Sequence, residues 1–455
     1  MENPFTAKYG LKYDLLEAHN EFKRLGYKHG GIYLATQPVY LIVDPDAIKT
    51  ILIKDFKYFT DRGSSVNEKI DPLSVNLGNL EGERWKNMRA KLSPTFTSAK
   101  MKLMFDTLLD CRLPMMNKLD EFCRNQREFD VKATMSCYTT DVIASCIFGL
   151  DSNSFENPNS KFKIYGGILI KPGIRTIIIQ NLRLTIPNVM KIFRIKLIPI
   201  EVEQFFLNLV KNIFEYRTTN NVYRNDFVQM LLEEQEKLRA SGQNPLSLEE
   251  IAAHSLGFFV SGFEPTSATI TFCLHELAFN QDVQDKLRDD RMSMEENGGK
   301  LSYDGVMGMK YLDQVMNETL RKYPTIPFLL RRCNTQYKIP NTNITLEPGI
   351  KIFISILALH LYEEYFPDPK RFVPERFNDE NRHKFPQYAY LPFGEGPRNC
   401  IGARFALMQT KTSLAMLLDK YKFLPVAGEP YDIEFDPKLA LLTKKGNLML
   451  NIEKL

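Results

Sequence analysis

A cysteine within a glycine-rich segment near the C-terminus constrains this chain more than any other feature. Residues 393–402 read Phe-Gly-Glu-Gly-Pro-Arg-Asn-Cys-Ile-Gly, and an apolar run with helical character follows directly. Cys400 is therefore expected at the N-terminus of a helix, where the macrodipole favours a thiolate. Glycine has no Cβ, so the backbone here can approach a bound cofactor closely and direct N–H groups at the sulfur. The segment predicts a metal-binding cysteine, and a cysteine in an ordinary surface turn is the weaker interpretation.

The composition limits which classes of protein this chain can belong to. The 455 residues are 44% hydrophobic, which is ample for a large core, and no linker, repeat or low-complexity segment divides them. The formal net charge of +4 gives no case for binding nucleic acid. Seven cysteines without regular spacing, together with the need for a thiolate, indicate a reducing compartment. No run of 18 apolar residues could span a membrane, and the first residues do not form a signal peptide.

Two further pairs of residues have helical spacing. Glu318 and Arg321 are three residues apart and share a helix face, upstream of Pro-Glu-Arg-Phe at 374–377. Trp85, the only tryptophan, is four residues before Arg89, so both side chains can reach one edge of a ligand. Without further evidence, the first pair would be interpreted as a surface ion pair that contributes little to stability. The second pair would be interpreted as a core tryptophan beside a surface arginine.

Together these segments resemble the cytochrome P-450 family, the haem-thiolate monooxygenases, and the resemblance covers nearly the whole chain. Within the family, the sequence most resembles the insect microsomal branch, which oxidises plant toxins and insecticides. The family fold is mainly α with small β-sheets (α+β), and haem b (iron) lies between an oxygen-activating helix and the cysteine-loop helix. Because the haem-binding segments must converge, residues 1–455 are expected to form a single haem-thiolate catalytic domain.

The resemblance implies a role for each matched residue. Cys400 would be the proximal ligand of the iron. Arg331 occupies the position of a propionate-binding arginine in the family, but Arg332 is next to it, so the choice between the two stays open. The structural triad that would lock the cysteine loop to the core is Glu318, Arg321 and Arg376. The residues expected to contact the haem are Trp85, Arg89, Arg331, Phe393, Arg398, Cys400 and Gly402.

One position departs from the family pattern. The run 255–267 resembles the oxygen-activating helix, but Pro265 stands where the family has threonine after its acid, here Glu264. Proline has neither a hydroxyl nor an N–H, so residue 265 cannot pass on a proton, and the carbonyl of Ser261 loses its helical partner. Three accounts stay open. Thr266 replaces the hydroxyl beside Glu264, water held by the Ser261 carbonyl and Glu264 carries the protons, or the enzyme rearranges or dehydrates hydroperoxides without a reductase.

Four segments surround the substrate in the family, at 62–80, 255–263, 325–330 and 439–443. In this chain they are rich in apolar side chains, which suits lipophilic substrates such as plant toxins, insecticides or endogenous lipids. Ordinary core packing is the alternative for each residue. The substrate-binding residues expected are Phe258, Phe259, Phe263, Ile326, Phe328, Leu329, Leu441 and Leu442, with Val66 and Leu73 on the first segment.

Electrons must come from another protein, because the chain has no flavin or nicotinamide fingerprint. The resemblance implies an NADPH-cytochrome reductase and a cytochrome b-type protein as donors, docked on a basic face by electrostatic steering. A solvated charged surface is the alternative, and a haem protein that sequesters lipophiles without turnover is a further functional class. The basic residues expected on this face are Lys86, Lys91, Lys100, Lys102, Arg404 and Lys411.

The resemblance also implies a place in the cell. A monomer on the cytoplasmic face of the endoplasmic reticulum membrane is expected, with the family's N-terminal anchor missing from this chain. Residues 174–210 mix apolar and basic side chains, so they either contact the lipid headgroups or roof the active site. Along the chain, a β-hairpin is predicted over 31–44, helices from 84 to 290 with breaks near 150–160, 171–173 and 240–248, and short strands within 335–355 and 423–453.

Overall fold

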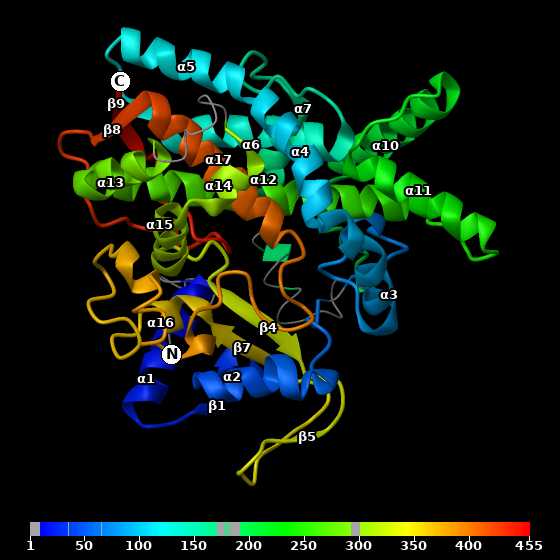
Figure 1. The fold of residues 1–455 in the computed structure, drawn as a ribbon. Coiled ribbons are helices and arrows are strands. Elements are labelled where there is room, and N and C mark those ends of the chain that lie inside the picture. Colours follow the sequence, from blue (N-terminus) through cyan, green and yellow to red (C-terminus); the bar gives the residue numbers. More distant parts are fainter. Residues whose placement is uncertain are drawn as a thin grey trace. The chain divides into compact units, whose positions relative to one another are not determined.

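The computed structural model describes residues 10–34, 36–64, 66–170, 178–179, 182, 192–292 and 301–455. The chain groups into two compact units, which are described separately. Figure 1 labels many of the helices and strands. Unit 1 comprises Met1–Gly63, Asn117–Met135 and Pro265–Leu455, and unit 2 comprises Ser64–Met116 and Ser136–Glu264. Three helices continue from one unit into the other, namely α5 (Arg112–Arg124), α6 (Val131–Phe148) and α12 (Leu248–Phe279). The single-domain organisation stays a prediction.

Unit 1 contains a four-stranded mixed sheet in the order β1-β2-β7-β4. β1 (His29–Leu34) and β2 (Gln37–Ile42) pair antiparallel, which confirms the predicted hairpin. β7 (Lys351–Ser355) runs parallel to β2 and antiparallel to β4 (Phe328–Arg332). The sheet thereby joins the N-terminal part of the chain to the segment that precedes the cysteine loop.

The apolar runs in β2 and β7 explain why this sheet is buried. Residues 39–42 and 352–355 are buried on both faces, as expected for central strands covered on two sides. Tyr40, Ile352 and Ile354 share one core cluster with Phe59 and Phe366. Unit 1 therefore has a hydrophobic core of its own, against which the cysteine loop can be held.

The other elements of unit 1 are helices and short strands. The helices are α1 (Gly10–Arg24), α2 (Pro45–Lys49), α13 (Gln281–Met292), α14 (Tyr303–Gly308), α15 (Lys310–Lys322), α16 (Ile356–His360) and α17 (Ala403–Lys420), with a π-helical turn η1 (Thr50–Lys54) and 3₁₀ turns η2 (Phe56–Tyr58), η5 (Pro374–Phe377) and η6 (Gln387–Ala389). A second sheet has the order β3-β9-β8, and a third pairs β5 with β6. These strands are β3 (Phe129–Asp130), β5 (Tyr337–Lys338), β6 (Thr345–Leu346), β8 (Tyr421–Pro425) and β9 (Met449–Lys454), in agreement with the strands predicted within 335–355 and 423–453.

Helices make up the described part of unit 2. They are α3 (Gly82–Leu92), α4 (Ser98–Asp110), α7 (Lys161–Ile170), α10 (Ile200–Asn220) and α11 (Phe227–Ala240), the larger parts of α6 and α12, and the 3₁₀ turns η3 (Pro72–Ser74) and η4 (Ser93–Phe96). α11 begins at Asp226, whose carboxylate accepts the Gln229 N–H at 2.9 Å and pairs with the buried Arg217. An aspartate at this position is a strong N-cap, so the helix start follows from the sequence.

The helix boundaries and the fold class agree with the predictions. α11 ends at Ala240 and α12 begins at Leu248, which confirms the break near 240–248. The break near 171–173 and much of the segment 174–210 lie outside the described residues. Among the helices that the structure describes, none is both long and apolar enough to cross a membrane. Many helices with three small sheets are the mainly α architecture with small β-sheets (α+β) that was predicted.

Candidate functional site

The cysteine segment forms a tight loop immediately before α17. The Cys400 N–H donates to the Phe393 carbonyl at 2.8 Å, which closes the loop on itself. Gly396 has a positive φ of 75°, and a Cβ there would lie 2.1 Å from the carbonyl oxygen of Leu52 in η1. Only glycine fits this approach, so the loop is held directly against η1. Gly402 caps α17, which places Cys400 at a helix N-terminus as predicted.

The accessibility of Cys400 separates it from the other cysteines. None of the seven forms a disulfide, and six are buried or half-buried while Cys400 is exposed. Buried thiols behave as inert apolar side chains, whereas a thiol with open space at its sulfur can bind a metal. Within unit 1, the cysteine singled out by the sequence is therefore the most accessible one, as a ligand to a bound group would need to be.

Glu318 holds two distant segments together through buried charges. Its carboxylate accepts hydrogen bonds from Arg321 Nε at 2.7 Å and Nη2 at 2.8 Å, and from Arg376 Nε at 3.4 Å. It also accepts the Val373 N–H at 2.9 Å. Arg321 in turn donates to the carbonyl of His360 at 2.9 Å. Glu318, Arg321 and Arg376 thus meet in space and tie α15 to the polypeptide that leads into the cysteine loop.

His360 extends this network and was not predicted. It is completely buried, and its Nε2 accepts the Leu391 N–H at 2.9 Å, two residues before the loop begins. Burial, with the neighbouring Arg321 charge, lowers the pKa of His360 to about 3, so the ring is neutral and can accept this bond. A lone histidine in the apolar run Ile-Leu-Ala-Leu-His carried no distinguishing sequence signal, because its partners are distant in sequence.

Three arginines of unit 1 gather near the cysteine loop. Arg331 is 2% exposed, and its Nε has no hydrogen-bond partner. Burial, followed by the charges of Arg62 and Arg398, lowers the pKa of Arg331 to about 9. Arg62 Nη2 donates to the Arg398 carbonyl at 3.3 Å. Asp61 pairs with Arg332 at 3.0 Å and with Arg398 at 3.7 Å, whereas the Nε of Arg331 is left without an acceptor from the protein.

The arginine cluster fits the propionates of a haem. Buried like charges are unfavourable unless an anion offsets them, and guanidinium groups bind carboxylates in a two-pronged geometry. The unpartnered Nε of Arg331 supplies a donor with no acceptor from the protein. The sequence missed Arg62, because residues 62–80 were interpreted as a substrate loop, whereas the fold brings its first residue to Arg398.

The helix with Pro265 is continuous. α12 runs from Leu248 to Phe279 with the proline inside it, and Thr269 Oγ1 donates to the Pro265 carbonyl at 2.8 Å. Glu264 and Thr266, the predicted acid and alcohol, are both buried. Because residues two apart on an α-helix project about 160° from each other, the helix does not bring these two side chains together. The roles of Glu264 and Thr266 as acid and alcohol stay predictions.

Trp85 and Arg89 lie on α3 in unit 2. Trp85 is 5% exposed, and the four-residue spacing puts Arg89 on the same helix face. The structure therefore places both residues as the spacing predicted, within that unit.

The predicted substrate residues of unit 2 pack mainly against other aromatic rings. Phe259 has no accessible surface, and its ring lies 5.5 Å from Phe206 and 5.1 Å from Phe263, centroid to centroid. A side chain lining a cavity large enough for water would retain accessible surface, so Phe259 belongs to the core of this unit. Phe258 is half-buried and packs against Phe227 at 4.6 Å.

The predicted substrate residues of unit 1 are of two kinds, core residues and residues that retain accessible surface. Leu442 is completely buried in a cluster with Phe272 and Tyr323, so it is a core residue. Ile326 is 49% exposed, and Phe328, Leu329 and Leu441 are half-buried. Leu329 lies against the cysteine loop, since a Cβ on Gly394 would be 3.6 Å from its Cδ2.

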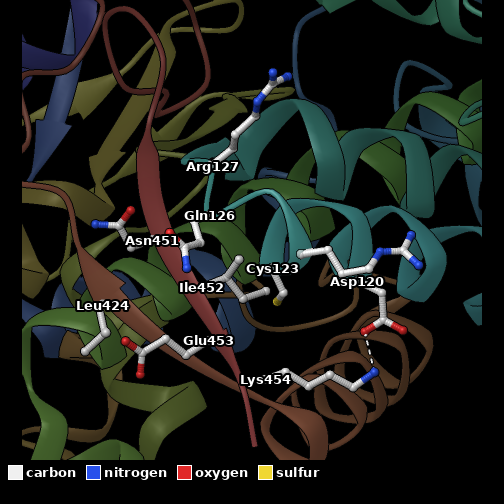
Figure 2. Close-up of a pocket in the computed structure, with 10 residues that line it drawn as sticks. Asp120, Cys123, Gln126, Arg127, Leu424, Asn451, Ile452, Glu453 and Lys454 are labelled. Carbon is white, nitrogen blue, oxygen red and sulfur yellow. Dashed lines mark ion pairs between the residues drawn. The ribbon is translucent and has the colours of Figure 1, made fainter.

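A separate cavity of unit 1 contains none of the predicted site residues. It has a volume of about 600 Å³ and lies between the end of α5 and the strands β8 and β9 (Figure 2). Asp120 and Lys454 form an ion pair of 2.9 Å at its edge, and both are partly exposed. Its other lining residues are Cys123, Arg124, Gln126, Arg127, Leu424, Asn451, Ile452 and Glu453. The mixed charges give it no clear ligand preference.

Comparison with known proteins agrees with the geometry of unit 1. The sequence profile described as cytochrome P450 matches residues 7–451. The chain is 40% identical over 442 residues to probable cytochrome P450 6a13 of Drosophila melanogaster, covering 97% of this chain and 88% of that protein. It is 38% identical over 468 residues to cytochrome P450 9e2 of Blattella germanica, with 96% and 88% covered. It is 37% identical over 432 residues to cytochrome P450 6A1 of Musca domestica, with 93% and 84% covered.

The profile and the relatives extend over the cysteine loop, the Glu318 network and α12 together, so they support one assignment for all three. The exposed cysteine suits the iron, and the buried arginines suit the propionates, of the haem that members of this family use as cofactor. On this evidence the chain belongs to the cytochrome P450 family and is a haem-thiolate monooxygenase.

Proposed function

We propose that this monooxygenase oxidises lipophilic small molecules such as plant toxins, insecticides or endogenous lipids, with electrons from NADPH through a cytochrome reductase. The observation that carries the proposal is the pairing, within unit 1, of an exposed Cys400 with the buried Arg331 cluster. These groups match the two ends of a haem, its iron and its propionates. When bound, the haem supplies the activation of dioxygen, and the protein supplies ligand, orientation and protons.

Each of the haem contacts has a proposed role. Cys400 ligates the iron, while Arg331 and Arg398, joined by Arg62, receive the propionates. The backbone of Phe393 and Gly402 shapes the loop around the sulfur, as the Cys400–Phe393 hydrogen bond indicates. For Trp85 and Arg89 of unit 2, the proposed contact with a propionate rests on the sequence resemblance alone. Glu318, Arg321 and Arg376 hold the loop and take no part in the chemistry.

The proposed substrate wall is apolar. Ile326, Phe328, Leu329 and Leu441 of unit 1 and Phe258 of unit 2 retain accessible surface, so they can contact a ligand. Phe259, Phe263 and Leu442 are buried and are proposed to support the wall from behind. Such a lining favours lipophilic substrates over polar ones.

The proposed docking of a reductase needs one correction to the basic face. Lys411 does not reach the surface, because it is buried in α17 and pairs with Asp313 at 2.7 Å. Arg404, at the start of α17, is exposed in unit 1. In unit 2, Lys86 and Lys102 are exposed and Lys91 and Lys100 half-exposed. These cations are proposed to steer an acidic reductase, or a cytochrome b-type donor, toward the protein.

The protein is proposed to be a monomer and to lie on the cytoplasmic face of the endoplasmic reticulum membrane. Ile192 and Phe193 are 73% and 70% exposed and stand beside the cation Arg194. Exposed apolar side chains next to a basic one are typical of contact with anionic headgroups.

The experiment is a reconstitution with a microsomal reductase. The reduced carbon monoxide spectrum first confirms thiolate ligation, and lipophilic probes are then screened for product, peroxide and NADPH consumed. The proposal predicts product that depends on NADPH and the reductase. Turnover of a hydroperoxide without NADPH, and no product with it, would instead identify an isomerase or dehydratase. Ligand-induced spin shifts without any product would identify a sequestering protein.

A further inference from the structure

Residues 434–445 form a hairpin in unit 1, on the chain between β8 and β9. The Asp436 N–H donates to the Thr443 carbonyl at 2.8 Å, and an antiparallel bridge lies one residue outside this pair. Residues 437–442 are therefore the tip of this C-terminal hairpin. Leu441, a half-buried residue of the proposed substrate wall, lies on the tip.

The tip is bonded to the segment that carries the other wall residues of unit 1. The Leu442 N–H donates to the Thr325 carbonyl at 3.0 Å, next to Ile326. Four residues after Thr325, Leu329 lies against the cysteine loop at Gly394. The cysteine loop, the segment after Thr325 and the hairpin tip are thus in contact one after another within unit 1. The position of the tip therefore sets the position of Leu441 relative to this wall.

The amine of Lys12 in α1 binds the tip at two points. Lys12 is 3% exposed, and its Nζ donates to the carbonyls of Asp436 and Leu439, the second at 3.0 Å. Burial lowers the pKa of Lys12 to about 8, while the nearby Asp436 carboxylate opposes this shift. Lysine is seldom buried unless its amine is hydrogen-bonded, and here the two carbonyls take the place of water. One amine thus fixes residues 436 and 439 relative to each other and to α1.

Two further contacts hold α1 against the hairpin. Gly10 has a positive φ of 67°, and a Cβ there would lie 2.1 Å from the carbonyl oxygen of Pro437. Only glycine fits so close to the tip. Leu16, one turn after Lys12, packs against the cluster that contains Leu442. Because its own helix is held on both sides of it, Lys12 cannot simply follow the tip if the tip moves.

We propose that Lys12 is a positioning residue for the substrate wall: it holds the hairpin tip so that Leu441 keeps a fixed place beside the segment after Thr325. This proposal rests on the substrate wall proposed above. Lys12 does not touch the substrate, and it acts through the carbonyls of Asp436 and Leu439. Without the amine, these carbonyls would lose a buried donor, and opening of the tip would let water replace it. A wall that moves in this way binds a bulky lipophile less tightly.

The test compares Lys12→Met with Lys438→Met in the haem-loaded protein. Methionine keeps an unbranched side chain of similar length but has no donor. Lys438 is exposed on the same tip, so its substitution is the matched control. A third variant, Lys12→Arg, keeps a cation that can donate to the carbonyls.

Two readouts separate positioning from general stability, and neither needs turnover. The first is hydrogen exchange of peptides that cover residues 434–445, with peptides from β7 as the reference for the rest of unit 1. The second is titration by difference absorbance with imidazole and with phenylimidazole. Both compounds bind a haem iron directly, but only phenylimidazole carries a ring that can reach an apolar wall.

The proposal predicts that exchange of the hairpin becomes about ten-fold faster in Lys12→Met, as expected for the loss of a hydrogen bond to a charged group, while β7 is unchanged. The Kd of phenylimidazole should rise about five-fold because apolar contact is lost, and that of imidazole should change less than about two-fold. Lys438→Met should match the wild type, and Lys12→Arg should lie closer to the wild type than Lys12→Met does.

Unchanged exchange in Lys12→Met overturns the proposal, as does equal weakening of both ligands. Identical behaviour of Lys12→Arg and Lys12→Met also overturns it, because the donors would then be irrelevant. Product formation by the wild type tests the proposed function separately. If no lipophilic probe is oxidised, that function fails, while exchange and the two titrations still decide the role of Lys12.

Discussion

Replacing Glu318 with alanine should destabilise this protein more than the loss of any exposed ion pair. The carboxylate is completely buried and accepts four hydrogen bonds, two from Arg321, one from Arg376 and one from the Val373 N–H. Alanine would leave the guanidinium of Arg321 buried without its counter-charge. Hydrogen bonds to the carbonyls of His360 and Pro369, both at 2.9 Å, would remain but would not neutralise it.

The expected loss is large compared with the stability of a folded protein. Removing one partner of a buried ion pair costs about 3–5 kcal/mol, because the other charge stays desolvated. Typical free energies of unfolding are about 5–15 kcal/mol, so at the lower end of that range the loss is more than half of the total. Glu318→Gln keeps the shape and one acceptor oxygen, and it should fall between the alanine variant and the wild type.

The same sequence motif offers a matched control. Glu375 is next to Arg376, but its pair with Lys286 at 2.8 Å is exposed, with 42% and 55% of the two side chains accessible. Glu375→Gln should therefore change stability by less than about 1 kcal/mol. Urea unfolding followed by circular dichroism, with haem absorbance as a second probe, measures all three variants. If Glu318→Ala loses no more stability than Glu375→Gln, the buried network does not hold the cysteine loop as described.

Three further predictions concern separate residues. Gly262→Ala should lose about 1–3 kcal/mol in unfolding experiments, because its Cβ would lie 2.5 Å from Ile143 Cδ1, whereas Gly167→Ala meets nothing within 4 Å and should be neutral or stabilising. His19 is buried with neither ring nitrogen bonded, and burial, with the Lys23 charge, lowers its pKa to about 3. Below pH 6.5 the ring takes up a proton in the unfolded chain but not in the folded one, so the free energy of unfolding falls by up to about 1.4 kcal/mol per pH unit as the pH is lowered. Above pH 6.5 this loss is absent. His19→Phe should therefore flatten the acid side of a curve of stability against pH. Arg331→Met should weaken haem retention about ten-fold or more, measured by transfer of haem to a scavenging protein, without destabilising the haem-free chain, while Arg332→Met should retain haem normally because Arg332 pairs with Asp61.

Much of the fold and part of the site could be predicted from local patterns. The hairpin of β1 and β2, the start of α12 at Leu248 and the helix after Cys400 follow from turn residues, periodicity and glycine placement within about ten positions. Glu318 and Arg321 were recognisable for the same reason, since one helical turn separates them.

Residues whose roles depend on distant partners could not be predicted in this way. Arg62 joins Arg331 and Arg398 only because the chain returns to the same place after more than two hundred residues. Lys411 has the sequence context of a surface lysine, but the fold places Asp313 and the Met307 carbonyl against its amine. A charged side chain is exposed or buried according to what packs over it, and a single segment does not contain that information.

The amino-acid sequence by itself determined the family and the absence of a hydroxyl at residue 265, and it predicted Cys400 as the cofactor ligand, because these depend on residue identity and short spacings. The tertiary structure decided which arginine joins the buried cluster and which phenylalanines are core. Burial and exposure are set by segments that meet only when the chain has folded. For that reason the sequence placed Lys411 on the basic face, whereas the fold buries it against Asp313.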